Sequence, residues 1–258
     1  MLNIIRYRIV HPYQARQRQK TILQETMRGY ESNRSSFPSR ITLPTPFAIG
    51  VSERAVEMML ARLTYEPGKE ILDIGHANAT PSHRAMLLDL PGPRVITGLD
   101  LANPVYDTTP YYKKSIRADI TANHLEENEF DLIWCISTLE HFGMDNSGYT
   151  DGFIRDAGHA GKALVEMVRL LKPGGKLLLT VPYGRFEDWG WFINYDARHW
   201  NTLLDVVRHE IDLSEWYFRH TQKLGWHIVP SEELTYTSYY DQHNFGAAGL
   251  VAALITKK

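Results

Sequence analysis

The chain has 258 residues, of which 43% are hydrophobic and 22% charged, and its formal net charge is −2. This composition is ordinary for a globular protein and allows one domain of moderate size, or one domain with an extension. No apolar run approaches the roughly 20 residues that span a bilayer, and the charge lacks the basic excess of nucleic-acid-binding proteins. With no secretory signal and a single cysteine, Cys135, we expect a cytoplasmic protein without a membrane span, a disulfide or a nucleic-acid partner.

The first 50 residues are expected to form an N-terminal extension, and residues 51–258 the main domain. Residues 1–24 contain no acid and five basic side chains, Arg6, Arg8, Arg16, Arg18 and Lys20. They form either an arm that faces a partner or a phosphate group, or a solvated terminal segment. Residues 31–50 are rich in Ser and Pro, which disfavour helix and strand, so we interpret them as a linker or as a lid over the site.

Strand and helix patterns alternate after residue 51. Helical spacings of apolar residues cover 52–63, 81–89 and 160–171, and Asp196 is expected to cap a later helix. Apolar strands are expected at 70–75, 94–100, 115–120, 130–137, 176–182, 210–218 and 248–256. The sequence Lys-Pro-Gly-Gly at 172–175 is expected to end a helix and turn the chain. Continuous apolar strands separated by helices predict an α/β fold with a doubly wound, mostly parallel sheet covered by helices on both faces.

The loop after the first of these strands is built from small residues. A dinucleotide site would need G-x-G-x-x-G, but positions 75, 77 and 80 read Gly, Ala and Thr. A different spacing, with Gly75, Ala77 and Ala79 at alternate positions, suits the methionine part of S-adenosylmethionine. That ligand has no pyrophosphate, so it needs small side chains but fewer bare backbone amides. The loop therefore favours S-adenosylmethionine over NAD.

Three acids follow three successive strands. Asp73 ends the first, near the expected position of the cofactor's cationic amino group, and Asp100 ends the second, where a carboxylate can accept hydrogen bonds from both ribose hydroxyls. Asp119 follows the third strand and can accept from the adenine amino group, while the backbone of Ile120 reads the edge of the ring. Each acid alone could be a cap or turn residue, but their order predicts S-adenosylmethionine as the cofactor.

Residues 70–182 resemble the Rossmann-like, class I methyltransferases that use S-adenosylmethionine. The segments that carry this resemblance are ILDIGHANA (71–79), VITGLDL (95–101), RADI (117–120), FDLIWCISTLEHFG (130–143) and LLKPGGKLLLTVPYG (170–184). It implies a seven-stranded sheet whose last strand, 248–256, is antiparallel. The implied cofactor-binding residues are Asp73, Gly75, His76, Ala77, Ala79, Asp100, Leu101, Asp119, Ile120 and Ser137.

The sequence departs from that family pattern in the first loop. Ala77 and Ala79 replace glycines, and His76 stands where a small residue or cysteine is commoner. His76 either touches the cofactor or projects into solvent. The segments 181–204, 224–230 and 245–255 are similar to methyltransferases found with sugar and polysaccharide biosynthesis enzymes, which implies a sugar or glycan precursor as the acceptor.

The expected reaction is an in-line attack by an acceptor oxygen or nitrogen on the sulfonium methyl group, which needs alignment, desolvation and a base. Candidate catalytic residues are His141, Glu140, Tyr183 and Asp196, with His199 a further possibility. His141 acts either as the base or by ordering the loop or the cofactor. The aromatic residues Trp189, Trp191, Phe192 and Tyr195 either stack on a ring substrate or pack in the core. Asp145, Asp151 and Asp156 are too scattered to predict a metal site.

The preferred function is methyl transfer from S-adenosylmethionine to a hydroxyl of a sugar or glycan precursor, with N-methylation of an amino sugar as the close variant. Two alternatives remain, an NAD-dependent oxidoreductase and a methyltransferase-like binding module without catalysis. A nucleotide-linked sugar as the acceptor and a homodimer are also left open.

Overall fold

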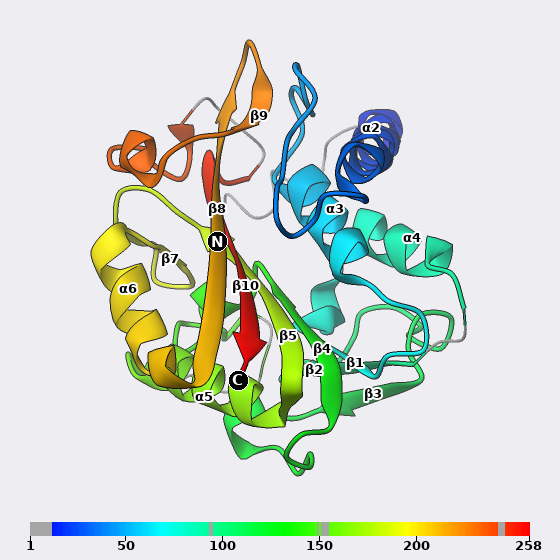
Figure 1. Ribbon diagram of the computed structural model, residues 1–258, viewed down its shortest axis with the longest axis vertical. Helices are drawn as coiled ribbons and strands as arrows, with labels where there is room; N and C mark the ends of the chain where they lie inside the picture. Colours follow the sequence, from blue (N-terminus) through cyan, green and yellow to red (C-terminus); the bar gives the residue numbers. More distant parts are fainter. Residues whose placement is uncertain (1–11, 93–94, 149, 151–154, 242–245) are drawn as a thin grey trace.

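A central eight-stranded sheet organises the computed structural model, which describes residues 12–92, 95–148, 150, 155–241 and 246–258. The strand order is β3-β2-β1-β4-β5-β10-β8-β9 (Figure 1). The strands are β1 (Ile71–Ile74), β2 (Ile96–Asp100), β3 (Lys114–Arg117), β4 (Phe130–Ile136), β5 (Leu171–Pro182), β8 (Ile211–Thr221), β9 (Gly225–Ile228) and β10 (Gly249–Lys257). A small second sheet pairs β6 (Glu187–Asp188) with β7 (Ile193–Asn194).

Helices cover both faces of the sheet. The helices α2 (Pro12–Asn33), α3 (Arg54–Thr64) and α4 (Pro81–Asp89) lie on one side, and α5 (His159–Leu170) and α6 (Ala197–Asp205) on the other (Figure 1). Short 3-10 helices complete the chain: η1 (His76–Asn78), η2 (Ile120–Ala122), η3 (Leu139–His141), η4 (Arg208–Glu210) and η5 (Ser231–Leu234). None of the helices in the described part of the chain has the length and apolar character that a membrane crossing needs.

Alternating side chains of the buried strands supply two hydrophobic cores. In β1, Ile71 packs into the core on the α3 side, whereas Leu72 packs into the core on the α5 side. The same alternation in β10 sends Leu250 to the first core and Val251 to the second. Strands that are buried on both faces therefore read as continuous apolar runs. The predicted doubly wound α/β fold is confirmed.

The sheet departs from the prediction in two places. The last strand, β10, is antiparallel to its neighbours β5 and β8, as expected, but an eighth strand, β9, pairs with β8. Residues 172–175 do not form a separate turn: α5 ends at Leu170, and Leu171 already pairs with Phe130. Gly174 has a φ of +75°, and the register of β5 on β4 shifts between Phe130 and Leu132, so the glycines form an irregular start of β5.

The N-terminal region is helical where the sequence suggested an arm. Helix α2 begins at Pro12 and packs against α3, with Ile22 and Thr26 buried in the contact. Asn33 at its end is fully buried and donates its amide to the Gly29 and Thr42 carbonyls, each at 2.7 Å. The predicted basic residues Arg16, Arg18 and Lys20 lie on this helix, whereas Arg6 and Arg8 lie outside the described residues. The division at residue 51 stays a prediction.

Candidate functional site

A cavity of ≈ 800 Å³ lies at the carboxyl ends of the parallel strands. Its walls come from the loops after β1, β2, β3 and β4, the first residues of α3 and the segment after β5. Ligands of doubly wound sheets bind at this edge. Residues 31–50, all of which are described, do not line the cavity, so the interpretation of this segment as a lid has no support here.

The loop after β1 uses its small residues for different purposes. Gly75 has a φ of +87°, and a Cβ there would collide with Thr138, so both backbone and space require glycine. Gly75 and Ala79 line the cavity. Ala77 is fully buried below it, and its N–H donates to Asp100 Oδ2 at 2.8 Å. Two of the three small residues, Gly75 and Ala79, thus lie in the cavity wall, while Ala77 supports the loop from behind.

His76 neither faces the cavity nor projects into solvent, so both interpretations of this residue are wrong. The side chain is 1% exposed, its Nε2 lies 2.7 Å from Ser115 Oγ, and its ring packs edge-on against Tyr112. The imidazole fits over Gly98, where a Cβ would collide with it. The unusual histidine in the loop thus packs against β2 and β3.

Asp73 is also buried behind the wall, with 1% of its surface exposed. Its Oδ2 accepts a hydrogen bond from the Tyr112 hydroxyl at 2.7 Å and lies 3.2 Å from His83 Nε2. Among these residues His83, near the start of α4, is the one that lines the cavity. The direct contact expected between Asp73 and a cofactor is therefore not supported, and His83, which the sequence analysis did not identify, lines the cavity in front of it.

Asp100 and Asp119 both line the cavity, as predicted. The Asp100 oxygens accept backbone hydrogen bonds from Ala77 and Ala102, each at 2.8 Å. Burial raises the pKa of this carboxyl group, while the two amides favour its charged form. Each oxygen can accept a second bond, which leaves capacity for two hydroxyl groups. Leu101 lines the wall beside it.

Another part of the cavity wall lies around η2. Asp119 Oδ1 accepts from both the N–H and the hydroxyl of Thr121 at 2.8 Å, and lies 3.4 Å from Nε2 of His159 at the start of α5. Ile120 is buried and contributes to the same wall. His159 also lines the cavity, and nothing in the local sequence pattern around it identified it as a site residue.

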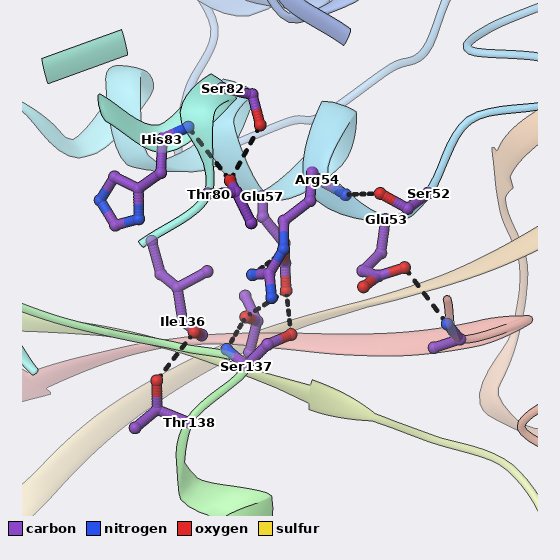
Figure 2. Close-up of polar contacts among 12 residues, drawn as sticks. Ser52, Glu53, Arg54, Glu57, Thr80, Ser82, His83, Ile136, Ser137 and Thr138 are labelled. Atoms are coloured by element: carbon purple, nitrogen blue, oxygen red, sulfur yellow. Dashed lines mark hydrogen bonds and ion pairs between the residues drawn. The ribbon is translucent and has the colours of Figure 1, made fainter. Parts of the chain in front are cut away.

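A buried polar network connects α3 to the ends of β4 and β5. Glu57 is fully buried and accepts from Ser137 Oγ at 2.5 Å and from Thr180 Oγ1 at 2.9 Å, while Arg54 Nη1 lies 2.7 Å from its second oxygen (Figure 2). Ser137 lines the cavity with a φ of +43°, a strained value that the bond to Glu57 helps to hold. Arg54 and Glu53 also line the cavity.

Glu140 and His141 follow β4 on η3, and both line the cavity, as predicted. His141 Nδ1 lies 2.8 Å from the Trp191 carbonyl, so it carries the proton and leaves Nε2 with a free lone pair. Burial lowers the pKa of His141 to about 4. The neutral imidazole is therefore a weak base at pH 7, which argues for an ordering role more than for the catalytic base.

Tyr183 and Asp196, the other two catalytic candidates, are not brought to the cavity. The Tyr183 ring is buried and packs edge-on against Tyr217, with centroids 5.0 Å apart. Asp196 caps α6: its Oδ1 accepts from the His199 N–H at 2.9 Å and lies 2.6 Å from His199 Nδ1. Its capping role was also predicted, and is confirmed.

Aromatic side chains form another part of the cavity wall. Trp191, Phe192 and Tyr239 line the cavity, whereas Trp189 and Tyr195 do not. The Phe192 ring contacts both others, with centroids 4.6 Å from Trp191 and 4.6 Å from Tyr239. Tyr239 is far from the other two in the sequence and was missed.

No group of three or more His, Cys, Asp or Glu side chains in the described ranges could hold a metal ion. Asp145 instead accepts from the Ser147 N–H at 3.0 Å, and Asp156 accepts from Gly158 and pairs with Lys162. The third candidate, Asp151, lies outside the described residues.

Residues 72–179 match a family model described as a methyltransferase domain. The chain is similar in structure to 1,6-didemethyltoxoflavin-N1-methyltransferase of Burkholderia thailandensis, with 14% identity, a TM-score of 0.52, and 97% of this chain and 92% of that one covered. It is also similar to the N-methyltransferase NodS of Bradyrhizobium japonicum, with 18% identity, a TM-score of 0.50, and 80% and 96% covered. No curated protein matches the sequence.

The fold is thus that of class I methyltransferases. At these low identities, the likeness of this chain to the two solved structures concerns the fold alone. The chain contains an S-adenosylmethionine-dependent methyltransferase domain at residues 72–179, as its motifs predicted. The match confirms the predicted enzyme class and the predicted cofactor class. It gives no support to the alternative of an NAD-dependent oxidoreductase. The match carries no specificity for sugars.

Proposed function

We propose that the protein binds S-adenosylmethionine along the ends of β1 to β4 and transfers its methyl group to a small molecule that enters beside Trp191. The observation that carries this proposal is that Gly75, Asp100 and Asp119 line one cavity, in the order of their strands. The fit is chemical as well, because Asp100 keeps two acceptor positions for ribose hydroxyls and Gly75 leaves space for a close approach.

The residues of this chain would hold the cofactor at three points. Asp100 would accept from the ribose hydroxyls, Asp119 would accept from the adenine amino group, and Gly75 with Ala79 would leave room for the methionyl tail. His83 and Arg54, which come from α4 and α3 (Figure 2), supply N–H donors for the carboxylate of that tail. The bound cofactor supplies an electrophilic methyl group on a sulfonium.

The acceptor is proposed to carry a ring, because the wall of Trp191, Phe192 and Tyr239 offers faces on which a ring can stack. A hydroxyl of a sugar or glycan precursor is the acceptor that the C-terminal segments favour, and an amino group is its variant. The chain contributes by aligning the acceptor with the methyl group and by excluding water. A base that removes the acceptor proton would increase the rate by about a further 10²–10⁴-fold.

Calorimetric titration with S-adenosylhomocysteine and with NAD⁺ tests this function. We expect one molecule of S-adenosylhomocysteine to bind per chain and NAD⁺ to give no binding heat. Binding of NAD⁺ without S-adenosylhomocysteine would contradict the proposal. If S-adenosylhomocysteine binds but no sugar or amine gains the mass of one methyl group, the non-catalytic module is the better account.

A further inference from the structure

Glu140 is a buried carboxyl group that is only partly satisfied by the protein. It is 3% exposed and lines the cavity directly after β4. Its Oε2 makes no hydrogen bond with any described residue, and its Oε1 lies 4.0 Å from His141 Nε2. A buried polar atom without a partner is unfavourable, because it has lost its hydrogen bonds to water without replacement. The open oxygen in the wall of a ligand cavity therefore indicates a donor on the ligand.

A second carboxyl group shares this end of the cavity. Glu53, 7% exposed, precedes α3, and its Oε2 accepts from the Ala247 N–H at 3.2 Å. Burial, reinforced by the charge of Glu57, raises the pKa of Glu53 to about 7. Burial also raises the pKa of Glu140 well above its usual range. Of the two, Glu53 can therefore exchange a proton near neutral pH. A positively charged ligand beside Glu140 would favour the charged form of its carboxyl group.

Two other titratable side chains beside Glu140 are Arg54 and His141, and neither gives its Oε2 a hydrogen bond. The positive charge of Arg54 partly offsets the rise in the pKa of Glu140, but Arg54 makes its ion pair with Glu57, at 2.7 Å. The His141 ring is neutral and stacked on Trp191, with centroids 5.1 Å apart. Aromatic faces attract cations, and Phe192 lies against the same ring cluster. This end of the cavity is thus suited to a ligand with a ring and a positive charge.

We propose that Glu140, together with Glu53, binds the amino group of the acceptor, so that the protein methylates the nitrogen of a ring-bearing amine. This inference rests on the proposed function and, of the two acceptor groups named there, selects the amino group over the hydroxyl. A hydroxyl group brings one donor, whereas an ammonium group brings three, which match two carboxyl groups and leave one for another acceptor. Glu140 is therefore a specificity-determining residue as well as a base.

The reaction balances with these groups. The ammonium group of the acceptor gives a proton to the Glu140 carboxylate, which becomes a neutral carboxylic acid. The freed lone pair on nitrogen forms the new N–C bond while the C–S bond breaks and its electron pair stays on sulfur. The positive charge thus moves from sulfur to nitrogen. A carboxyl group with a raised pKa is a better proton acceptor for this step than an ordinary one.

Two matched pairs of probes test the inference: glucosamine against glucose, and tyramine against tyrosol. The protein saturated with S-adenosylhomocysteine is titrated with each probe by calorimetry. We expect at least one amine to bind about 10-fold or more tightly than its hydroxyl partner, because a hydrogen bond to a charged group contributes about 1.5–3 kcal/mol. With S-adenosylmethionine, mass spectrometry should find the methyl group on nitrogen.

The variant Glu140→Gln should reduce that preference to about 3-fold or less, because the charge is lost but the shape is kept. Its affinity for S-adenosylhomocysteine should stay within about 3-fold of wild type. Glu31→Gln, an exposed side chain on α2 outside the cavity, is the matched control and should change neither value. Failure of both amines to bind, equal binding of amine and hydroxyl, or a preference that survives in Glu140→Gln would overturn the inference. Failure of S-adenosylhomocysteine itself to bind would instead contradict the proposed function on which it rests.

Discussion

Replacing Glu57 with alanine is expected to lower the free energy of unfolding by about 3–5 kcal/mol. The side chain is fully buried and connects α3 to the ends of β4 and β5 through Ser137, Thr180 and Arg54. Its removal leaves two hydroxyl groups without their acceptor and the Arg54 guanidinium without its closest counter-charge. Urea denaturation followed by circular dichroism measures the change.

The matched control is Glu31→Ala. Glu31 pairs with Arg34 at 2.8 Å, but both side chains are more than half exposed on α2. Exposed ion pairs contribute about 0–1 kcal/mol to stability, so the free energy of unfolding of this variant should be close to that of wild type. A loss of less than about 1 kcal/mol in Glu57→Ala would show that the buried network does not hold α3 against the sheet.

Replacing Asp100 with asparagine is expected to weaken the binding of S-adenosylhomocysteine by about 10–100-fold. The carboxylate is held by the Ala77 and Ala102 amides and keeps one acceptor position on each oxygen for a ribose hydroxyl. Asparagine keeps the shape but has a single acceptor oxygen and no charge, so it cannot accept from both hydroxyls. Calorimetry gives the change in affinity.

Asp107→Asn is the control for this variant. Asp107 is exposed on the segment that follows β2, accepts local hydrogen bonds from Thr109, whose N–H lies at 3.0 Å, and does not line the cavity. The affinity of Asp107→Asn for S-adenosylhomocysteine should match that of wild type within about 2-fold. If Asp100→Asn also binds within about 3-fold of wild type while its melting temperature is unchanged, the ribose does not contact Asp100.

Much of the fold could be predicted because its signals are local. The strands buried on both faces appear as continuous apolar runs, and α4 was expected at 81–89 and spans Pro81–Asp89. Its start is marked by Thr80, whose side chain accepts from the His83 N–H, followed by a proline at the first position. The strand β9 was missed because four residues, 225–228, give too short a pattern.

The cavity wall at the strand ends was easier to predict than the rest of the wall. Parallel strands bring their carboxyl ends to one edge, so Asp100 and Asp119 could be placed together from strand order alone. Glu53 and Tyr239 meet through folding of distant segments: the carboxyl of Glu53 accepts from Ala247, which is 194 residues away. No spacing within one segment can indicate such a contact.

Local patterns also misplaced individual side chains. His76 was expected at the cofactor or in solvent because the loop faces the cavity, but its imidazole turns under the loop to fill the space above Gly98. Asp73 likewise ends β1 but turns to Tyr112 and His83. The backbone positions of both residues were predicted correctly. The direction of each side chain depends on the space and the partners that neighbouring elements provide, such as the space over Gly98 for His76. These neighbours are set by the tertiary fold and cannot be seen in a local sequence pattern.

A crystal structure of the protein with S-adenosylhomocysteine tests the central claim most directly. The account predicts that the nucleoside lies at the ends of β1 to β3, with its ribose hydroxyls within hydrogen-bonding distance of Asp100 and its adenine amino group next to Asp119. A nucleoside bound elsewhere, or one in this cavity whose ribose contacts neither carboxylate, would contradict it.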